Sequence, residues 1–414
     1  MSDPEPPEPG PSIATPAGSL SFAFLASDPM GLAEQVRGAD IALRTDDAAV
    51  VASCLTSIDG RAAEVHLLPE GRSWEGTPIE LELGPDGKGG RGRLWIRSGA
   101  GHEGSTQWIV YTSGTTGEPK PVGHTLGSLT RTIVRGRRRG TFVWGLVYDP
   151  NRMAGLQVLL QSLHTRSSLV APALATPLPE RVRMMVAANV TALSATPTLW
   201  RRILQVPTVR TWSLEQITLG GEIADQQILD ALRRRFPTAR VTHVFASTET
   251  GAAFSVSDGL AGFPASYLDA PPNGIRLAIR DNVLFVENRD ATTSGDDGFA
   301  STGDVVELSQ DRVLFKGRAS GVVNVGGSNV WPEQVEALLR QHPEVEDAAV
   351  SAKASSLAGN VLIASVVPTP GSDPTSLRRS LRRWVRERAP TSHVPAQVTV
   401  VDALQHSSTG KLQR

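Results

Sequence analysis

Residues 111 to 120 read Tyr-Thr-Ser-Gly-Thr-Thr-Gly-Glu-Pro-Lys, and this stretch decides how the rest of the chain is interpreted. An apolar run at 107–112 leads into it and predicts a buried strand. Its two glycines let backbone N–H groups turn toward an anion, its hydroxyl groups add donors, and Lys120 adds positive charge. The stretch therefore predicts a phosphate-binding loop that directly follows a strand. A flexible polar turn is the alternative when the stretch is considered alone.

The predicted loop is not a Walker A sequence, because its lysine follows Pro119 and no Ser or Thr comes after it. Contacts to phosphate are expected from its backbone as well as its side chains. The residues assigned to phosphate binding are Thr112, Ser113, Gly114, Thr115, Thr116, Gly117 and Lys120.

Downstream of the loop, short apolar runs alternate with helical patterns as far as residue 245. This alternation indicates a doubly wound, mostly parallel sheet, whose ligands bind at the carboxyl ends of the strands. Strands are predicted at 107–112, 141–148, 169–171, 192–194, 216–219 and 241–245. Helices are predicted at 154–163, 179–188, from 198 onward and at 225–236.

The pattern changes after Gly251 to short strands joined by tight turns over 275–316. Beyond Gly317 a compact unit of helices and strands follows. The predicted fold class is α/β: a large N-terminal domain with a doubly wound, mostly parallel sheet and a small antiparallel β subdomain, then a small α+β C-terminal domain. Residues 1–18 hold six prolines and predict a disordered tail, because such a composition buries little apolar surface.

The overall charge excludes some classes of partner. Among 414 residues, 41 Lys and Arg face 42 Asp and Glu, so nothing favours binding to nucleic acid or to an anionic membrane. Cys54, the one cysteine, cannot form a disulfide within the chain. The apolar run at 20–26 is too short to span a bilayer and follows no basic residue. We therefore predict no membrane span and a cytoplasmic location.

Further segments accompany the loop, and with it they occur in the order typical of one superfamily. The segments are Leu219-Gly-Gly-Glu222, Phe245-Ala-Ser-Thr-Glu-Thr-Gly251, Ser301-Thr-Gly-Asp304, Gly317-Arg318 with Asn324-Val-Gly-Gly327 and Pro332-Glu-Gln-Val-Glu336, and Ser408-Thr-Gly-Lys-Leu-Gln-Arg414. On these segments the chain resembles the adenylate-forming superfamily of acyl-CoA synthetases, carrier-protein adenylation domains and luciferases. The segment before the loop is shorter than in typical members, so the chain resembles a shortened member.

The resemblance implies an enzyme that uses ATP and Mg²⁺. In such enzymes a carboxylate attacks the α-phosphate of ATP, pyrophosphate leaves, and the acyl-adenylate waits for a second nucleophile. Lys411 would be the catalytic lysine, carried by a small mobile domain over 319–414 next to an ATP- and acid-binding domain over 19–318. Thr248 would hydrogen-bond the α-phosphate. Glu249 would hold Mg²⁺, for which a carboxylate is a suitable ligand.

The resemblance also assigns contacts to the rest of the nucleotide and to coenzyme A. Phe245 stands where members have an aromatic residue that packs on adenine. Asp304 would accept hydrogen bonds from both ribose hydroxyls, with Arg318 assisting. The segment 324–327 resembles a loop whose small residues leave a channel for the pantetheine arm of coenzyme A. Besides the phosphate loop, the residues assigned to cofactor binding are Gly220, Gly221, Glu222, Phe245, Ala246, Ser247, Asp304, Arg318, Gly326 and Gly327.

Some features depart from the family pattern or stay ambiguous. Ser320 stands at the pivot between the two domains, where Asp or Lys is usual, and Ala246 replaces a glycine. Arginines over 131–139 and 378–388 could meet the phosphates of coenzyme A or an acidic carrier protein. A solvated helix face is the simpler explanation for both runs.

The function predicted from the sequence is adenylation of a carboxylic acid followed by transfer of the acyl group to a thiol. The expected partners are a small-molecule acid and either coenzyme A or an acyl carrier protein. Three alternatives stay open: adenylation for a carrier protein, ATP-dependent activation of nitrite for reaction with an aryl amine, and a catalytically degenerate adenylate-binding protein. The identity of the acid does not follow from the sequence.

Overall fold

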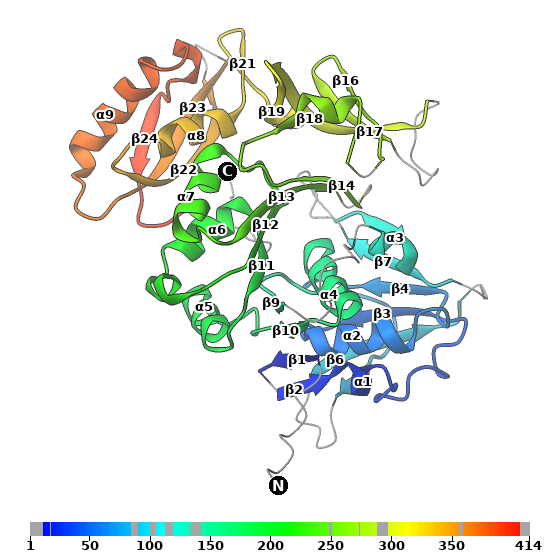
Figure 1. Ribbon diagram of the computed structural model, residues 1–414. Helices are drawn as coiled ribbons and strands as arrows, with labels where there is room; N and C mark the ends of the chain where they lie inside the picture. Colours follow the sequence, from blue (N-terminus) through cyan, green and yellow to red (C-terminus); the bar gives the residue numbers. More distant parts are fainter. Residues whose placement is uncertain are drawn as a thin grey trace.

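The computed structural model describes residues 11–16, 18–83, 90–99, 105–111, 119–131, 133, 142–247, 251–272, 274–287, 297–355 and 359–405. Within these ranges the strands form four sheets. Figure 1 shows two large sheets in the blue-to-green half of the chain, with a smaller yellow-green sheet and an orange-red C-terminal unit beside them.

The largest sheet has eight strands in the order β14-β13-β12-β11-β9-β10-β1-β2. Neighbours from β13 to β1 run parallel, and the edge strands β14 and β2 run antiparallel to them. The predicted doubly wound, mostly parallel sheet is therefore confirmed, but the strand predicted at 107–112 lies in the other large sheet. Its strands are β1 (Ser12–Thr15), β2 (Gly18–Ser21), β9 (Val143–Gly145), β10 (Ser168–Val170), β11 (Ala192–Ala195), β12 (Gln216–Gly220), β13 (Arg240–Ser247) and β14 (Gly251–Val256).

The helices between these strands begin at defined caps. Helix α6 begins where the Thr196 hydroxyl accepts a hydrogen bond from the Leu199 N–H at 3.1 Å. Helix α7 begins where Asp225 accepts from the Ile228 N–H at 3.0 Å. Because a helix that follows a parallel strand starts at the carboxyl end of that strand, both caps lie at the edge where ligands are expected. The helices are α4 (Met153–Thr165), α5 (Leu178–Ala187), α6 (Pro197–Leu204) and α7 (Gln226–Arg235).

The second large sheet has six strands in the order β5-β6-β3-β4-β7-β8. Its central strands β3, β4 and β7 run parallel. Helix α2 (Ala48–Ser57) begins at Asp47, whose carboxylate accepts from the Ala49 N–H at 2.8 Å. The strands are β3 (Asp40–Arg44), β4 (Glu64–Leu67), β5 (Ile79–Glu82), β6 (Arg91–Arg97), β7 (Gln107–Tyr111) and β8 (Pro121–His124).

Strand β1 shows that the prediction of a disordered tail over 1–18 is wrong for its last part. Ile13 of β1 pairs with Leu169 of β10, and its side chain is fully buried. The proline-rich composition averages over the whole stretch, whereas a short extended segment with one apolar side chain is enough to pair with an open sheet edge. Residues 1–10 and 17 lie outside the described ranges.

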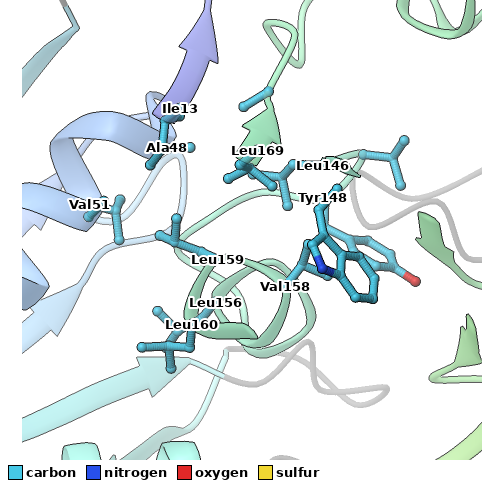
Figure 2. Packing of buried hydrophobic residues seen from close by; sticks show 14 of the residues in the cluster. Ile13, Ala48, Val51, Leu146, Tyr148, Leu156, Val158, Leu159, Leu160 and Leu169 are labelled. Atoms are coloured by element: carbon cyan, nitrogen blue, oxygen red, sulfur yellow. The ribbon is translucent and has the colours of Figure 1, made fainter. Parts of the chain in front are cut away.

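One apolar layer joins the two large sheets. Figure 2 shows Leu159 of α4 between Leu169 of β10 and Val51 of α2, and all three side chains are fully buried. Burial of each such side chain stabilises the fold by about 1.5–3 kcal/mol. Helices α2 and α4 therefore fix the position of one sheet relative to the other.

The remaining strands form the predicted antiparallel subdomain and the C-terminal α+β unit, which confirms the fold class. The antiparallel sheet has the order β15-β19-β18-β17-β16, and the C-terminal sheet has the order β21-β20-β23-β22 with β24 beside β23. Each has its own apolar cluster, one around Phe263 and one around Val366. No helix in the described part of the chain is long and apolar enough to cross a membrane.

The bounds of these last elements are β15 (Phe263–Pro264), β16 (Leu277–Arg280), β17 (Val283–Glu287), β18 (Phe299–Ser309), β19 (Arg312–Arg318), β20 (Val323–Val325), β21 (Ser328–Val330), α8 (Pro332–Arg340), β22 (Val345–Ser355), β23 (Gly359–Pro368), α9 (Pro374–Arg386) and β24 (Gln397–Val400). Short helical segments complete the described chain at α1 (Phe22–Leu25), α3 (Leu126–Thr130), Pro207–Thr211, Ala265–Leu268, Ala319–Gly321 and Thr391–His393.

A network of largely buried charges joins the C-terminal unit to the eight-stranded part. Arg340, in the last turn of α8, lies 2.9 Å from Asp347 and 3.8 Å from Asp225, the cap of α7. Asp225 also forms an ion pair with Arg201 of α6. The side chains of Arg340 and Asp225 are only 10% and 21% exposed. Removal of one partner from a buried ion pair leaves the other charge uncompensated, so this network strongly restricts substitution.

We predict that Asp225→Asn destabilises the protein by about 2 kcal/mol or more. Asparagine caps a helix as well as aspartate does, so the variant keeps the α7 cap and loses only the charge that Arg201 and Arg340 share. The measurement is the midpoint of denaturant unfolding. Asp373→Asn is the matched control, because Asp373 caps α9 from an exposed position and should change stability by less than about 0.5 kcal/mol. Equal effects of the two substitutions would contradict the prediction.

Candidate functional site

The predicted phosphate loop connects two paired strands. Tyr111, the last residue of β7, pairs with Pro121, the first residue of β8, in an antiparallel ladder. Residues 112–118 lie outside the described ranges, so the roles assigned to Thr112, Ser113, Gly114, Thr115, Thr116 and Gly117 stay predictions. Lys120 is described and exposed. The hairpin therefore brings both ends of the loop to one edge of the six-stranded sheet.

The Gly-Gly-Glu segment lies at the carboxyl end of β12, where a nucleotide site is expected. Gly221 has a φ of +77°, a conformation that glycine adopts without strain. Glu222 accepts a hydrogen bond from the Thr198 N–H at 2.9 Å, so its carboxylate binds the first turn of α6. This contact was not predicted, and it fixes the orientation of the segment relative to α6. Gly220 pairs with Val244 of β13, which places the next motif alongside.

Phe245 is the aromatic residue of that next motif. Its half-buried ring lies parallel to Phe254 of β14 and Phe315 of β19, with centroid distances of 5.2 and 5.4 Å. Phe315 thereby connects the end of β13 to the antiparallel sheet. The ladder between β13 and β14 is irregular between Phe245 and Ala246, and Ala246 is exposed. Packing of Phe245 on adenine stays a prediction.

The catalytic part of this motif is only partly described. Ser247 is the last residue of β13 and pairs with Gly251. Thr248 and Glu249 lie outside the described ranges, as does Lys411. In the described part of the chain, no group of three or more His, Cys, Asp or Glu residues could hold a metal ion. The assignment of Mg²⁺ to Glu249 therefore stays a prediction.

Asp304 is a buried carboxylate in β18 with an organised environment. It is 8% exposed, and its Oδ1 accepts from Nη1 of Arg318 at 3.1 Å. The Thr302 hydroxyl accepts from the Asp304 N–H at 3.1 Å and itself donates to the Leu284 carbonyl at 2.8 Å. Burial raises the pKa of the Asp304 carboxyl, and the Arg318 guanidinium opposes that rise. A carboxylate beside an exposed arginine can accept hydrogen bonds from a diol.

Arg318 also lies at the connection to the C-terminal unit, directly before the segment Ala319–Gly321 that contains the predicted pivot Ser320. The indole N–H of Trp331 donates to the Arg318 carbonyl at 3.1 Å. A Cβ on Gly317 would lie 2.4 Å from the Trp331 ring, so only glycine fits there. The sequence analysis did not single out Trp331, because no local pattern connects it to Gly317 and Arg318 before the fold is known.

Gly326 and Gly327 form the turn between β20 and β21. Their φ angles are +56° and +87°, the pattern of a two-residue hairpin turn in which both central residues are left-handed. The Asn324 side chain closes the turn by accepting from the Gly327 N–H at 3.1 Å. Backbone geometry alone therefore explains both glycines. A role for this turn in binding coenzyme A stays a prediction.

Two segments match models of one enzyme family. Residues 46–284 match the model of the AMP-binding enzyme, and residues 334–411 match that of the AMP-binding enzyme C-terminal domain. A Mycobacterium tuberculosis protein, described as a probable 2-succinylbenzoate–CoA ligase, is 30% identical over 322 residues, which cover 74% of this chain and 82% of that protein. A nonribosomal peptide synthetase of Salinispora arenicola is 28% identical over 344 residues, 74% of this chain but 4% of that protein.

Solved structures share the whole fold. The anthranilate CoA ligase AuaEII, determined in complex with anthranoyl-AMP, superposes with a TM-score of 0.77 and 16% identity over 98% of this chain and 92% of that one. Both family models match in the expected order, and the first of them alone covers more than half of the chain. The chain therefore belongs to the AMP-binding enzyme family, and it is an adenylate-forming ligase.

Proposed function

We propose that this ligase activates a carboxylic acid as its acyl-adenylate and then transfers the acyl group to coenzyme A. The observation that carries the proposal is the match over 74% of the chain to a relative described as a CoA ligase. We assign the separate parts of the adenylate to three described features, namely the hairpin β7–β8, the end of β12 and the Asp304–Arg318 pair.

In the adenylation step the protein mostly positions groups and neutralises charge, since phosphoryl transfer requires little covalent help from side chains. We assign the ribose hydroxyls to Asp304, with Arg318 holding the carboxylate in place. We assign the phosphates to the loop at 112–118 and to Lys120. Mg²⁺, when bound, would neutralise charge between the phosphates, and Glu249 is the residue assigned to hold it.

The transfer step requires a second arrangement of the same parts. We propose that residues 319–414 form a small domain that turns about Ser320, so that Lys411 serves adenylation and the turn at 326–327 then approaches the adenylate. The contact between Trp331 and the Arg318 carbonyl lies at this connection, and a rotation there would change it. Motions of this kind often limit the overall rate of such enzymes.

A carrier protein is the second candidate acceptor. The match to a nonribosomal peptide synthetase supports it, and so does helix α9, which presents exposed arginines on the side opposite its buried Leu377, Leu381 and Val385. Acidic partners associate faster with such a surface. The exposed residues are Arg378, Arg379, Arg382, Arg383 and Arg386.

We predict that Lys411→Ala lowers acid-dependent ATP–pyrophosphate exchange by about 10² or more, the usual effect of losing one group that stabilises transition-state charge. Formation of thioester from a supplied acyl-adenylate should keep its rate, because the lysine is assigned to adenylation only. Both rates are measured on the same preparation. A parallel fall of the two rates would contradict the separate role.

We predict that Gly327→Trp impairs thioester formation more than adenylation, because a large side chain would fill the proposed thiol channel. Space around Gly327 is open, but its φ of +87° strains any other residue. Gly327→Ala is therefore the matched control, since it carries the same backbone strain without the bulk. The prediction fails when the alanine and tryptophan variants form thioester from acyl-adenylate at the same rate.

The acid and the acceptor are tested by incubating the protein with ATP, Mg²⁺ and panels of aryl and alkyl acids, or with nitrite and aryl amines. We expect pyrophosphate release to depend on an organic acid, and a bulky acid to act best, because buried apolar area contributes about 25 cal/mol per Å². Coenzyme A should then yield a thioester, followed by mass spectrometry. AMP formation that requires nitrite and ignores every carboxylic acid would establish the diazotising alternative instead.

A further inference from the structure

Tyr111 is held by contacts from several parts of the chain. It is the last residue of β7, directly before the predicted phosphate loop, and it is 4% exposed. The guanidinium of Arg72 lies 4.5 Å from the centre of its ring. Its main-chain carbonyl accepts from Nη1 of Arg152, at the start of α4, at 3.1 Å. Its ring and its carbonyl are therefore both fixed by cationic side chains.

The hydroxyl of Tyr111 ends a chain of three polar side chains. It lies 2.9 Å from Nδ1 of His66, and Nε2 of His66 lies 3.0 Å from Oε2 of Glu64. A carboxylate only accepts hydrogen bonds, so Nε2 carries the imidazole proton and Nδ1 has a free lone pair. The Tyr111 O–H therefore donates to Nδ1. Because the Glu64 carboxylate can only accept, it sets the direction of both hydrogen bonds among Glu64, His66 and Tyr111.

The register of the sheet brings these residues together. Strands β4 and β7 run parallel, and His66 pairs with Ile109. Side chains alternate across a strand, so Tyr111, two residues beyond Ile109, lies on the same face as His66. Trp74 packs on the imidazole with ring centroids 4.4 Å apart and covers this face. His66 and Tyr111 are thus covered by the segment that follows β4, whereas the side chain of Glu64 is 45% exposed.

The surroundings of His66 and Tyr111 favour the protonation states that these hydrogen bonds require. Burial lowers the pKa of His66, although Glu64 and Asp40 oppose the shift, and Arg97 adds to it. Burial also raises the pKa of Tyr111, against the effect of Arg72. Both groups are therefore held in their neutral forms, which is the state that a hydroxyl-to-imidazole hydrogen bond requires.

We propose that Glu64, His66 and Tyr111 form a positioning network that orients the start of the phosphate loop and thereby raises the affinity of the protein for the triphosphate of ATP. His66 and Tyr111 are positioning residues, since they act through the backbone that follows residue 111. The proposal rests on the proposed function in one respect, namely that the loop binds the phosphates of ATP. The proposal predicts that disruption of the network lowers the affinity for ATP more than the affinity for AMP, because AMP lacks the two terminal phosphates.

Three single variants test the network, with equilibrium binding of ATP and of AMP to the full chain as the measurement. Tyr111→Phe removes only the hydroxyl. His66→Gln places an amide near the position of Nε2 and leaves Tyr111 without an acceptor, whereas His66→Asn places an amide oxygen near the position of Nδ1. We expect the first two variants to raise the Kd of ATP about three- to tenfold and that of AMP less than about twofold, the effect of one lost hydrogen bond. His66→Asn should retain most of the ATP affinity.

Tyr267→Phe is the control, because that hydroxyl lies 3.5 Å from the Ser255 carbonyl in the antiparallel part of the protein and should affect neither ligand. The double variant Tyr111→Phe/His66→Gln should bind ATP no more weakly than either single variant, because both remove the same hydrogen bond. The proposal would be overturned if the increase in the Kd of ATP in the double variant equalled the product of the increases in the two single variants. It would also be overturned by a loss of thermal stability in Tyr111→Phe and His66→Gln with unchanged ATP affinity, or by an equal loss of affinity for ATP and AMP.

Binding measurements keep this test separate from the proposed function. A wild-type protein that binds ATP but releases pyrophosphate with none of the acids would lose the proposed function, while the network could still be measured. If Tyr111→Phe does not fold, the comparison of His66→Gln with His66→Asn decides, because only the latter retains an acceptor for the Tyr111 hydroxyl. Equal ATP affinity of these two variants would overturn the proposal.

Discussion

The apolar layer that helices α2 and α4 share fixes the two large sheets relative to each other, and these sheets carry the ends of the predicted phosphate loop and the Gly-Gly-Glu segment. The candidate site draws on both sheets: the hairpin β7–β8 belongs to the six-stranded sheet, and the carboxyl ends of β12 and β13 belong to the eight-stranded sheet. Fully buried side chains such as Leu159 hold the sheets at a fixed separation. Close packing of this kind resists small displacements, so the two sheets keep one relative orientation.

The sequence predicted the parallel sheet well and the six-stranded sheet poorly, and the physical reason is burial. Strands such as β11 and β12 lie between helices and read as short apolar runs. Strand β6 instead carries the exposed arginines Arg91, Arg93 and Arg97 among apolar residues. It therefore did not stand out from the glycine-rich stretch before it. Strand β1 was missed because its pairing with β10 is not visible in local composition.

The candidate site divides in a similar way. The sequence motifs identified Asp304, Arg318 and the glycines as candidate site residues. The structure explains two of the glycines: the turn needs the left-handed backbone of Gly327, and Trp331 excludes any side chain at Gly317. Contacts between distant segments could not be predicted from the sequence. His66 lies 45 residues before Tyr111, and no pattern within either strand connects them until the register of β4 and β7 is known. Side-chain networks of this type follow from topology rather than from local propensity.

The pairing of β1 with β10 has a consequence for the order in which the protein can fold during synthesis. Leu169 is synthesised more than 150 residues after its partner Ile13, so β1 cannot join the eight-stranded sheet until β10 exists. Long-range pairing of this kind slows folding, because a long stretch of chain must be ordered before the contact forms. Until β10 has been synthesised, the hairpin of β1 and β2 has no strand beside β1, and this side of β1 stays open in the nascent chain.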